Sequence, residues 1–125
     1  MPEKLNWTFA ARVLGGPTIA DSGEVEIEAY VKLAVTVKKG TTQDVEIFPG
    51  DGGSASVVVI NPVEPSDKLT YEVGPDKVPL DGPHVLIGAG AVGMLGNKVG
   101  TLKFENGTAH DAEVSILAGR TDATP

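Results

Sequence analysis

The sequence predicts an all-β protein, an antiparallel β-sandwich of about eight strands with a jelly-roll or immunoglobulin-like arrangement. Two observations lead to this fold class. The segment 24–39 alternates apolar and polar side chains along most of its length, which is the two-residue period of a strand with one buried face and one solvated face. The other apolar segments are short, are separated by Gly, Pro, Asn and Asp, and lack the 3.6-residue period of a helix.

The first predicted strand covers residues 5–13. Leu5, Trp7 and Phe9 alternate with polar or small residues, and we expect this apolar set to lie on the inner face of the sandwich. The Gly-Gly-Pro sequence at 15–17 is a turn signal that should end the strand.

The alternating segment at 24–39 is the longest predicted strand, and it would span roughly 50 Å if it were unbroken. We expect the next apolar segment to return antiparallel to it. Pairing Val37 with Val45 keeps both apolar sets on one face, and it places Lys38 opposite Asp44 as a favourable cross-strand pair.

The middle of the chain predicts two further strands and a crossing loop. Residues 54–60 predict a strand, and its last four residues, 57–60, are apolar on both parities, so this strand should be covered on both faces. The two prolines within 61–67 argue against a central strand there. Residues 69–73 resume the alternation and predict a short strand.

The last third predicts a meander of strands at 84–95, 99–105 and 112–119, with Gly-Asn and Asn-Gly turn signals between them. We assign 1–119 to a single sandwich domain and 120–125 to a flexible C-terminal tail.

The segment 84–93 matches a strand followed by the G-x-G-x-x-G pattern of dinucleotide-binding folds, with Gly88, Gly90 and Gly93 in the glycine positions. The surrounding sequence argues against a nucleotide site. More glycines interrupt the residues where a helix should follow, and too few residues remain for a doubly wound sheet. We expect instead a small-residue strand that another backbone approaches closely, either in the core or in another subunit. The three glycines are our candidate subunit contacts.

The composition of the chain limits the kinds of partner that we expect it to bind. The chain has a net charge of −7 and no cysteine, so we expect no nucleic acid, no anionic membrane surface and no disulfide framework. We expect no cofactor and no metal, because His84 and His110 are the only histidines and the carboxylates lack ligand spacing. The N-terminus has no apolar signal-peptide region. We therefore expect a cytoplasmic protein, or one in a particle assembled from the cytoplasm.

The function that this pattern favours is a non-catalytic structural or interaction protein that forms a symmetric oligomer, for example a component of a phage or other particle. The segment 24–39 carries three glutamates in its first half and three lysines in its second half. Two antiparallel copies would match these charges. Alternatively, Asp44 and Glu46 neutralise the lysines within one chain.

A second hypothesis is a β-sandwich module that binds a small ligand or a glycan. Tyr30 and Phe48 could form a small aromatic platform on the solvated face, and Asp51 lies in a glycine-rich loop. These three residues are our candidate ligand contacts. A monomer with an exposed aromatic cleft would favour this hypothesis, whereas an assembly that buries 88–93 would favour a structural role.

Overall fold

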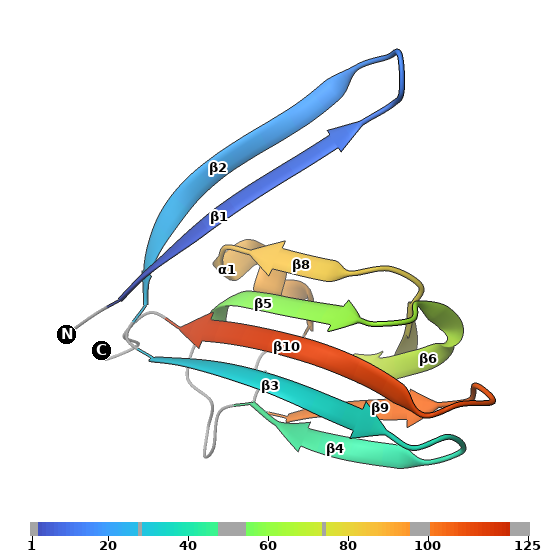
Figure 1. Cartoon of the computed structure of the whole chain (residues 1–125). Coiled ribbons are helices and arrows are strands. Elements are labelled where there is room, and N and C mark those ends of the chain that lie inside the picture. Colours follow the sequence, from blue (N-terminus) through green and yellow to red (C-terminus); the bar gives the residue numbers. More distant parts are fainter. Residues whose placement is uncertain (1–2, 28, 48–54, 74, 96–100, 121–125) are drawn as a thin grey trace.

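The computed structural model describes residues 3–27, 29–47, 55–73, 75–95 and 101–120 (Figure 1). The strands are β1 (Glu3–Arg12), β2 (Thr18–Ile27), β3 (Ala29–Val37), β4 (Thr42–Glu46), β5 (Ala55–Pro62), β6 (Ser66–Val73), β7 (Asp76–Leu80), β8 (His84–Ile87), β9 (Thr101–Asn106) and β10 (Ala112–Arg120). Two short helical turns, α1 (Ala89–Val92) and η1 (Gly93–Leu95), follow β8.

Strands β3 to β10 form a sandwich of two four-stranded antiparallel sheets. The first sheet has the order β3-β10-β5-β8 and the second has the order β4-β9-β6-β7. Consecutive strands change sheet at every step except β6 to β7, which gives the jelly-roll arrangement. The predicted all-β antiparallel sandwich is therefore confirmed, and of the two predicted arrangements this strand order matches the jelly roll.

One apolar core fills the space between the two sheets. The inward side chains follow the two-residue period of each strand, so that Val114, Ile116 and Ala118 point inward from β10 and are buried. Tyr71 of β6 and Phe104 of β9 are the bulkiest fully buried side chains, with ring centroids 6.0 Å apart. Strand β5 has neighbours on both edges and is mostly buried on both faces, as its sequence predicts.

Strands β1 and β2 form a separate two-stranded sheet, which we call the arm (residues 3–27). The arm rises away from the first sheet and stands clear of the sandwich along most of its length (Figure 1). A strand at 5–13 was correctly predicted. Its apolar side chains do not enter the core, however, and Phe9 is 41% exposed.

The predicted long strand at 24–39 is wrong, because β2 ends at Ile27 and β3 begins at Ala29. Val31 and Leu33 of β3 pack against the core, whereas Ile27 of β2 lies over Gly119 on the outside of the first sheet. Alternation determines which side chains share a face within a strand. It does not determine whether one sheet holds the strand from end to end.

The predicted hairpin between 24–39 and Val45 is also wrong. Strand β4 lies in the second sheet and pairs with β9, which places Asp44 opposite Lys103. The short connection after β3 crosses between the sheets instead of turning within one sheet. A cross-strand charge pair favoured the hairpin, but the same aspartate finds a lysine on a different strand.

The predicted meander of the last three strands does not form. Strand β8 ends at Ile87, and β9 and β10 lie in different sheets with β4, β6, β3 and β5 as neighbours. Gly88 has a φ of +99°, a conformation that glycine adopts without strain, and it leads the chain out of β8 into α1. The predicted turn at 96–97 falls outside the described residues.

Two predicted boundaries shift. Strand β5 extends to Pro62 and β6 begins at Ser66, so the crossing loop is shorter than the predicted 61–67. Arg120 is the last residue of β10 rather than the start of the tail. Residues 121–125 lie outside the described part of the chain.

Candidate assembly surface

The arm is an amphipathic ribbon. Its register pairs Leu5 with Val25 and Ala11 with Ile19 on one face, and side chains alternate between faces along each strand. This apolar arm face consists of Leu5, Trp7, Phe9, Ala11, Ile19, Asp21, Gly23, Val25 and Ile27. The other face carries small or charged side chains, and on it Lys4 and Glu24 lie 3.9 Å apart.

Trp7 lies flat against its partner strand. Its ring stacks on Phe9 with a centroid distance of 6.0 Å and an interplanar angle of 8°. A Cβ atom at Gly23 would lie 2.7 Å from Trp7 Cζ2, so only glycine at this position allows the ring to cross β2. The stacked rings form a flat apolar surface in the middle of the arm.

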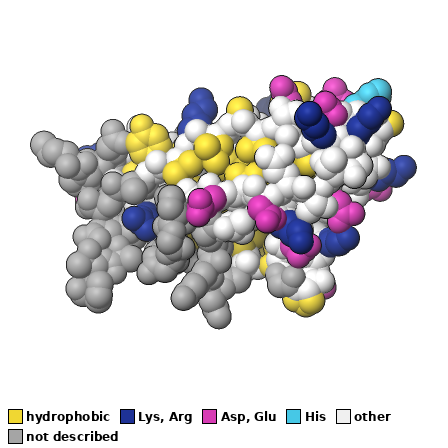
Figure 2. Space-filling model, turned by 90° about the horizontal axis from the view of Figure 1, so that it is seen from below, with side chains coloured by type: hydrophobic (Ala, Val, Ile, Leu, Met, Phe, Trp, Pro, Cys, Tyr) yellow, Lys and Arg dark blue, Asp and Glu magenta, His cyan; other side chains and the backbone are white. Residues whose placement is uncertain are grey.

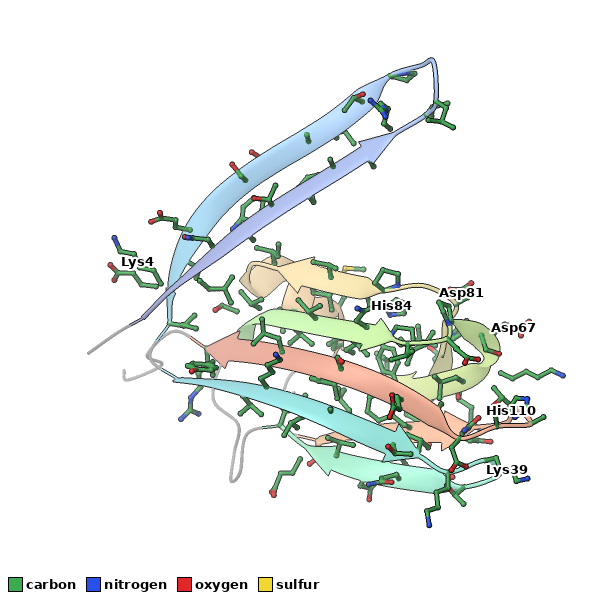
Figure 3. All side chains as sticks on the ribbon, viewed as in Figure 1. Lys4, Lys39, Asp67, Asp81, His84 and His110 are labelled. Atoms are coloured by element: carbon green, nitrogen blue, oxygen red, sulfur yellow. The ribbon has the colours of Figure 1, made fainter. Side chains whose placement is uncertain are left out.

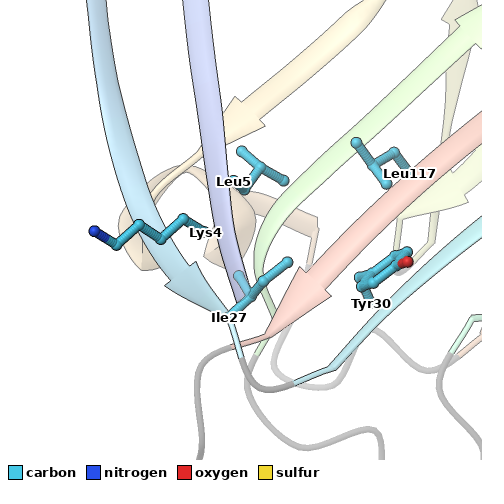
Figure 4. A pocket seen from close by; sticks show the side chains of 5 residues that line it. All are labelled: Lys4, Leu5, Ile27, Tyr30 and Leu117. Atoms are coloured by element: carbon cyan, nitrogen blue, oxygen red, sulfur yellow. The ribbon is translucent and has the colours of Figure 1, made fainter. Parts of the chain in front are cut away.

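The base of the arm forms a pocket with the first sheet (Figure 4). The pocket has a volume of about 280 Å³ and is lined by Lys4, Leu5, Ile27, Tyr30 and Leu117. Leu5 and Ile27 come from the apolar arm face, whereas Tyr30 and Leu117 lie on the outer surface of β3 and β10. At its base, therefore, the apolar arm face is directed toward the sheet.

The outer surface of the first sheet carries apolar side chains on the rows near the arm base, whereas Ser115, Asn61 and Glu113 follow on the rows farther from it. We call this outer surface the sheet face; it includes Tyr30, Val59, Val85 and Leu117, whose side chains point away from the core by the strand parity. Among the described residues, eight large hydrophobic side chains are exposed. Six of them lie on the arm or on the sheet face: Phe9, Val13, Leu14, Ile19, Tyr30 and Val85. The exposed apolar surface is thus concentrated on the arm and on the sheet face.

The outer surface of the second sheet is different. Figure 2 views the molecule from below and shows acidic and basic side chains close to one another, beside a group of apolar side chains. On this surface Lys77 Nζ lies 2.6 Å from Glu105 Oε1, and Lys103 Nζ lies 3.9 Å from Glu72 Oε2. Such mixed charge keeps a sheet face solvated, so the two faces of the sandwich meet different surroundings.

The two histidines have separate places (Figure 3). His84 begins β8, and its Nδ1 lies 2.7 Å from the Tyr71 hydroxyl, a bond that links the two sheets. Burial raises the pKa of Tyr71. His110 lies in the loop before β10, where its carbonyl accepts a hydrogen bond from Asn106 Nδ2. Both residues have structural contacts in this fold.

The candidate glycines lie in a turn rather than in a strand. Gly88 follows β8, Gly90 lies in α1 and Gly93 begins η1. A Cβ atom at any of the three would meet nothing within 4 Å among the described residues, so the predicted close approach of another backbone is not made within that part of the chain. α1 spans four residues and β8 is antiparallel to β5, which does not give the strand–helix context of a dinucleotide site. Their role as subunit contacts stays a prediction.

Of the candidate ligand contacts, Tyr30 lies on the sheet face with 53% exposure and lines the pocket. Phe48 and Asp51 fall outside the described residues. Within the described ranges, no three His, Asp or Glu side chains gather where they could hold a metal ion. In the same ranges, no helix is long and apolar enough to cross a membrane.

Sequence reasoning missed the tip of the arm. Val13 is 63% exposed and Leu14 is 86% exposed, and they precede the turn at Gly15 and Gly16. Two bulky apolar residues directly before a Gly-Gly turn were the available signal, since hairpin turns are usually polar.

The comparisons with known proteins found no match to a family model, a curated protein or a solved structure.

Proposed function

We propose that this chain is a non-catalytic structural protein that assembles with copies of itself through the arm. The observation that carries the proposal is the position of the apolar arm face, which stands away from the core. An isolated two-stranded hairpin is marginally stable in water, and apolar side chains gain free energy when a partner removes them from solvent. A second surface that covers the arm would provide both effects.

The charge of the arm supports a copy of the same chain as the partner. The chain as a whole has a net charge of −7, but residues 7–23 contain one arginine, one aspartate and no other charged residue. An acidic protein repels its own copies over most of its surface. The neutral part of the arm is where two copies approach each other without that repulsion.

A component of a phage or other particle is the form of assembly that we propose. Particle shells repeat one chain many times, and an arm that reaches a neighbour extends such contacts from copy to copy. Jelly rolls occur in viral capsids, although the fold also serves lectins and enzymes. This part of the proposal rests on fold analogy, and negative-stain electron microscopy of the concentrated protein tests it: closed or regular particles support it, and their absence contradicts it.

Self-assembly is tested by light scattering after size exclusion, at low and high salt. We expect an oligomer at both salt concentrations, because screening weakens charge contacts and leaves apolar contacts intact. Ile19→Asp on the arm should give a monomer. Val63→Asp is the matched control, because Ile19 and Val63 are 66% and 62% exposed. A monomeric wild-type protein, or equal behaviour of the two variants, would overturn the proposal.

A second candidate function is supported by the pocket at the base of the arm. Its volume of about 280 Å³ is near the lower end of small-molecule sites, and Tyr30 offers a hydroxyl beside apolar walls. A small apolar ligand there would shield Leu5 and Leu117. Isothermal titration with small aromatic alcohols tests this candidate, with Tyr30→Ala expected to abolish the binding heat.

A further inference from the structure

From the arm and the pocket together, we infer a specific partner surface: the arm tip of one copy enters the base pocket of a second copy. Leu14 and Val13 of the tip would pack against Leu5, Tyr30 and Leu117 of the other chain. This inference rests on the proposed self-assembly and specifies its contact.

The arm tip and the base pocket match in size. Leu14 is the most exposed large hydrophobic side chain in the described part of the chain. The pocket has apolar walls from Leu5, Ile27 and Leu117, and Lys4 and Tyr30 complete its lining. A volume of about 280 Å³ accommodates a leucine together with part of a valine. An apolar plug and a hollow of similar size with three apolar walls thus occur on the same chain.

The arm tip cannot reach the base pocket of its own chain. Residues 5 and 14 lie at opposite ends of the extended arm, about 30 Å apart at roughly 3.3 Å per residue. The tip and the pocket therefore meet only between two copies. If each copy offers its tip to the other, the contact is isologous and closes as a two-fold dimer.

This contact would stack the arms and the first sheets of the two copies in layers. An arm that enters the opening of a second copy lies between that copy's arm and its sheet face. The two apolar arm faces then pack on each other. The opposite face of each arm lies on the partner's sheet face. Near the tip it presents Arg12 at the last strand pair and otherwise small side chains: Thr8, Ala10, Thr18, Ala20 and Ser22. Small residues let that ribbon lie close to the sheet.

The surface area that would be buried favours the interlocked dimer. An arm face about 33 Å long and two strands wide covers about 300 Å². Packing of the apolar arm faces alone would bury about 600 Å², which is less than specific interfaces need. The interlocked dimer covers both faces of each arm and two sheet faces, six surfaces that together bury about 1,800 Å². This value lies within the range of stable interfaces.

The decisive experiment uses the absence of cysteine from the chain. Leu14→Cys protein is mixed with Leu117→Cys protein, allowed to exchange, oxidised, and run on a non-reducing gel. We expect a disulfide-linked dimer, because a disulfide forms when the two Cβ atoms come within about 4 Å. Tyr30→Cys, at an exposed position of the same pocket, replaces Leu117→Cys if that variant does not fold. The control mixture is Leu14→Cys with Val63→Cys, which should not cross-link.

A second measurement is the dissociation constant of the assembly. Leu14→Asp should weaken assembly by about 100-fold, because two tips are lost from every dimer. Val63→Asp is the matched control, since Val63 is 62% exposed and lies in the loop between β5 and β6. It should leave assembly unchanged.

The outcomes separate this inference from the proposed function. If the wild-type protein assembles but the tip does not cross-link to the pocket, the tip contact is wrong and self-assembly stands. If a chain carrying both Leu14→Cys and Leu117→Cys links only within itself, the arm folds back on its own sheet, and the inference is likewise wrong. A monomeric wild-type protein refutes both.

Discussion

Asn106 is the residue whose side chain joins most segments of the sandwich. It is buried at the end of β9, and its Nδ2 donates to the carbonyls of Val37 and His110 at 2.8 Å. Its Oδ1 accepts hydrogen bonds from the amide and the hydroxyl of Thr108. One amide group therefore fixes the loop before β10 and the end of β3 together.

We expect Asn106→Ala to lower the free energy of unfolding by about 2 kcal/mol, because it removes the side-chain donor of the buried Val37 carbonyl. Urea unfolding followed by circular dichroism measures the loss. Asn61→Ala is the control; Asn61 is exposed on β5, so its removal should change the free energy by less than about 0.5 kcal/mol. Equal losses for the two variants would contradict this role.

We expect the free energy of unfolding to fall at high pH because of Tyr71. Its pKa is raised in the folded protein by burial, so the folded state holds the phenol proton more strongly than the unfolded state does. The resulting stabilisation is complete below pH 10, near the unfolded pKa, and is lost as the pH rises through the folded pKa.

Tyr71→Phe removes this titration together with the bond to His84. At pH 7 we expect the variant to be less stable than the wild type by about 1 kcal/mol. Between pH 10 and 11.5 this difference should shrink, and denaturant titrations at each pH would measure it. Tyr30→Phe, which alters an exposed phenol, is the comparison. A constant difference across this range would show that the proton on Tyr71 does not contribute.

At the scale of elements, the arm depends on the fit between Trp7 and Gly23. Gly23→Ala would place a methyl group within 2.7 Å of the indole, so the ring must leave β2. We expect a changed near-UV circular dichroism signal and a shifted Trp fluorescence maximum, because Trp7 is the only tryptophan. The main unfolding transition of the sandwich should be unchanged. Gly82→Ala, at a position with open space around it, should alter neither signal.

The positions of the strands could be predicted from sequence more fully than the pairing between strands. The two-residue period located β3, β6 and β9, because alternation is a local property of the chain, and a continuous apolar run located β5. The pairing was mostly missed, because a jelly roll sends consecutive strands to opposite sheets, and turn signals do not distinguish a hairpin from a crossing. The run from Val25 to Val37 shows the limit, since one alternating pattern serves both the arm and the core.

The candidate site shows the same limit. Tyr30 was identified from its parity and does line the pocket. The pocket itself was not predictable, because Leu5 and Leu117 are more than 100 residues apart in sequence. Val13 was placed at a strand end and Leu14 was not singled out. Only the structure shows that nothing in the described part of this chain covers them.

At the scale of the whole molecule, assembly should make thermal stability depend on concentration. A partner that binds the folded chain stabilises it by mass action. We expect the melting temperature of the wild-type protein to rise as the protein concentration rises from about 1 to 100 μM. The melting temperature of Leu14→Asp should stay constant, and differential scanning fluorimetry with both proteins decides the matter. A wild-type melting temperature that is independent of concentration would contradict self-assembly.

The ends of β1 and β10 meet where the arm joins the sandwich. Glu3 pairs with Ile27, Arg120 pairs with Ala29, and a single residue lies between those two partners in the sequence. A short linker between the two ends would therefore close the chain into a ring, and a new opening at 63–65, between β5 and β6, would leave every strand pair intact. In that circular order the arm is an insertion in the turn between β10 and β3, which are antiparallel neighbours. The jelly roll would then be complete as a ring without the arm, and arms of other lengths could be exchanged at that turn.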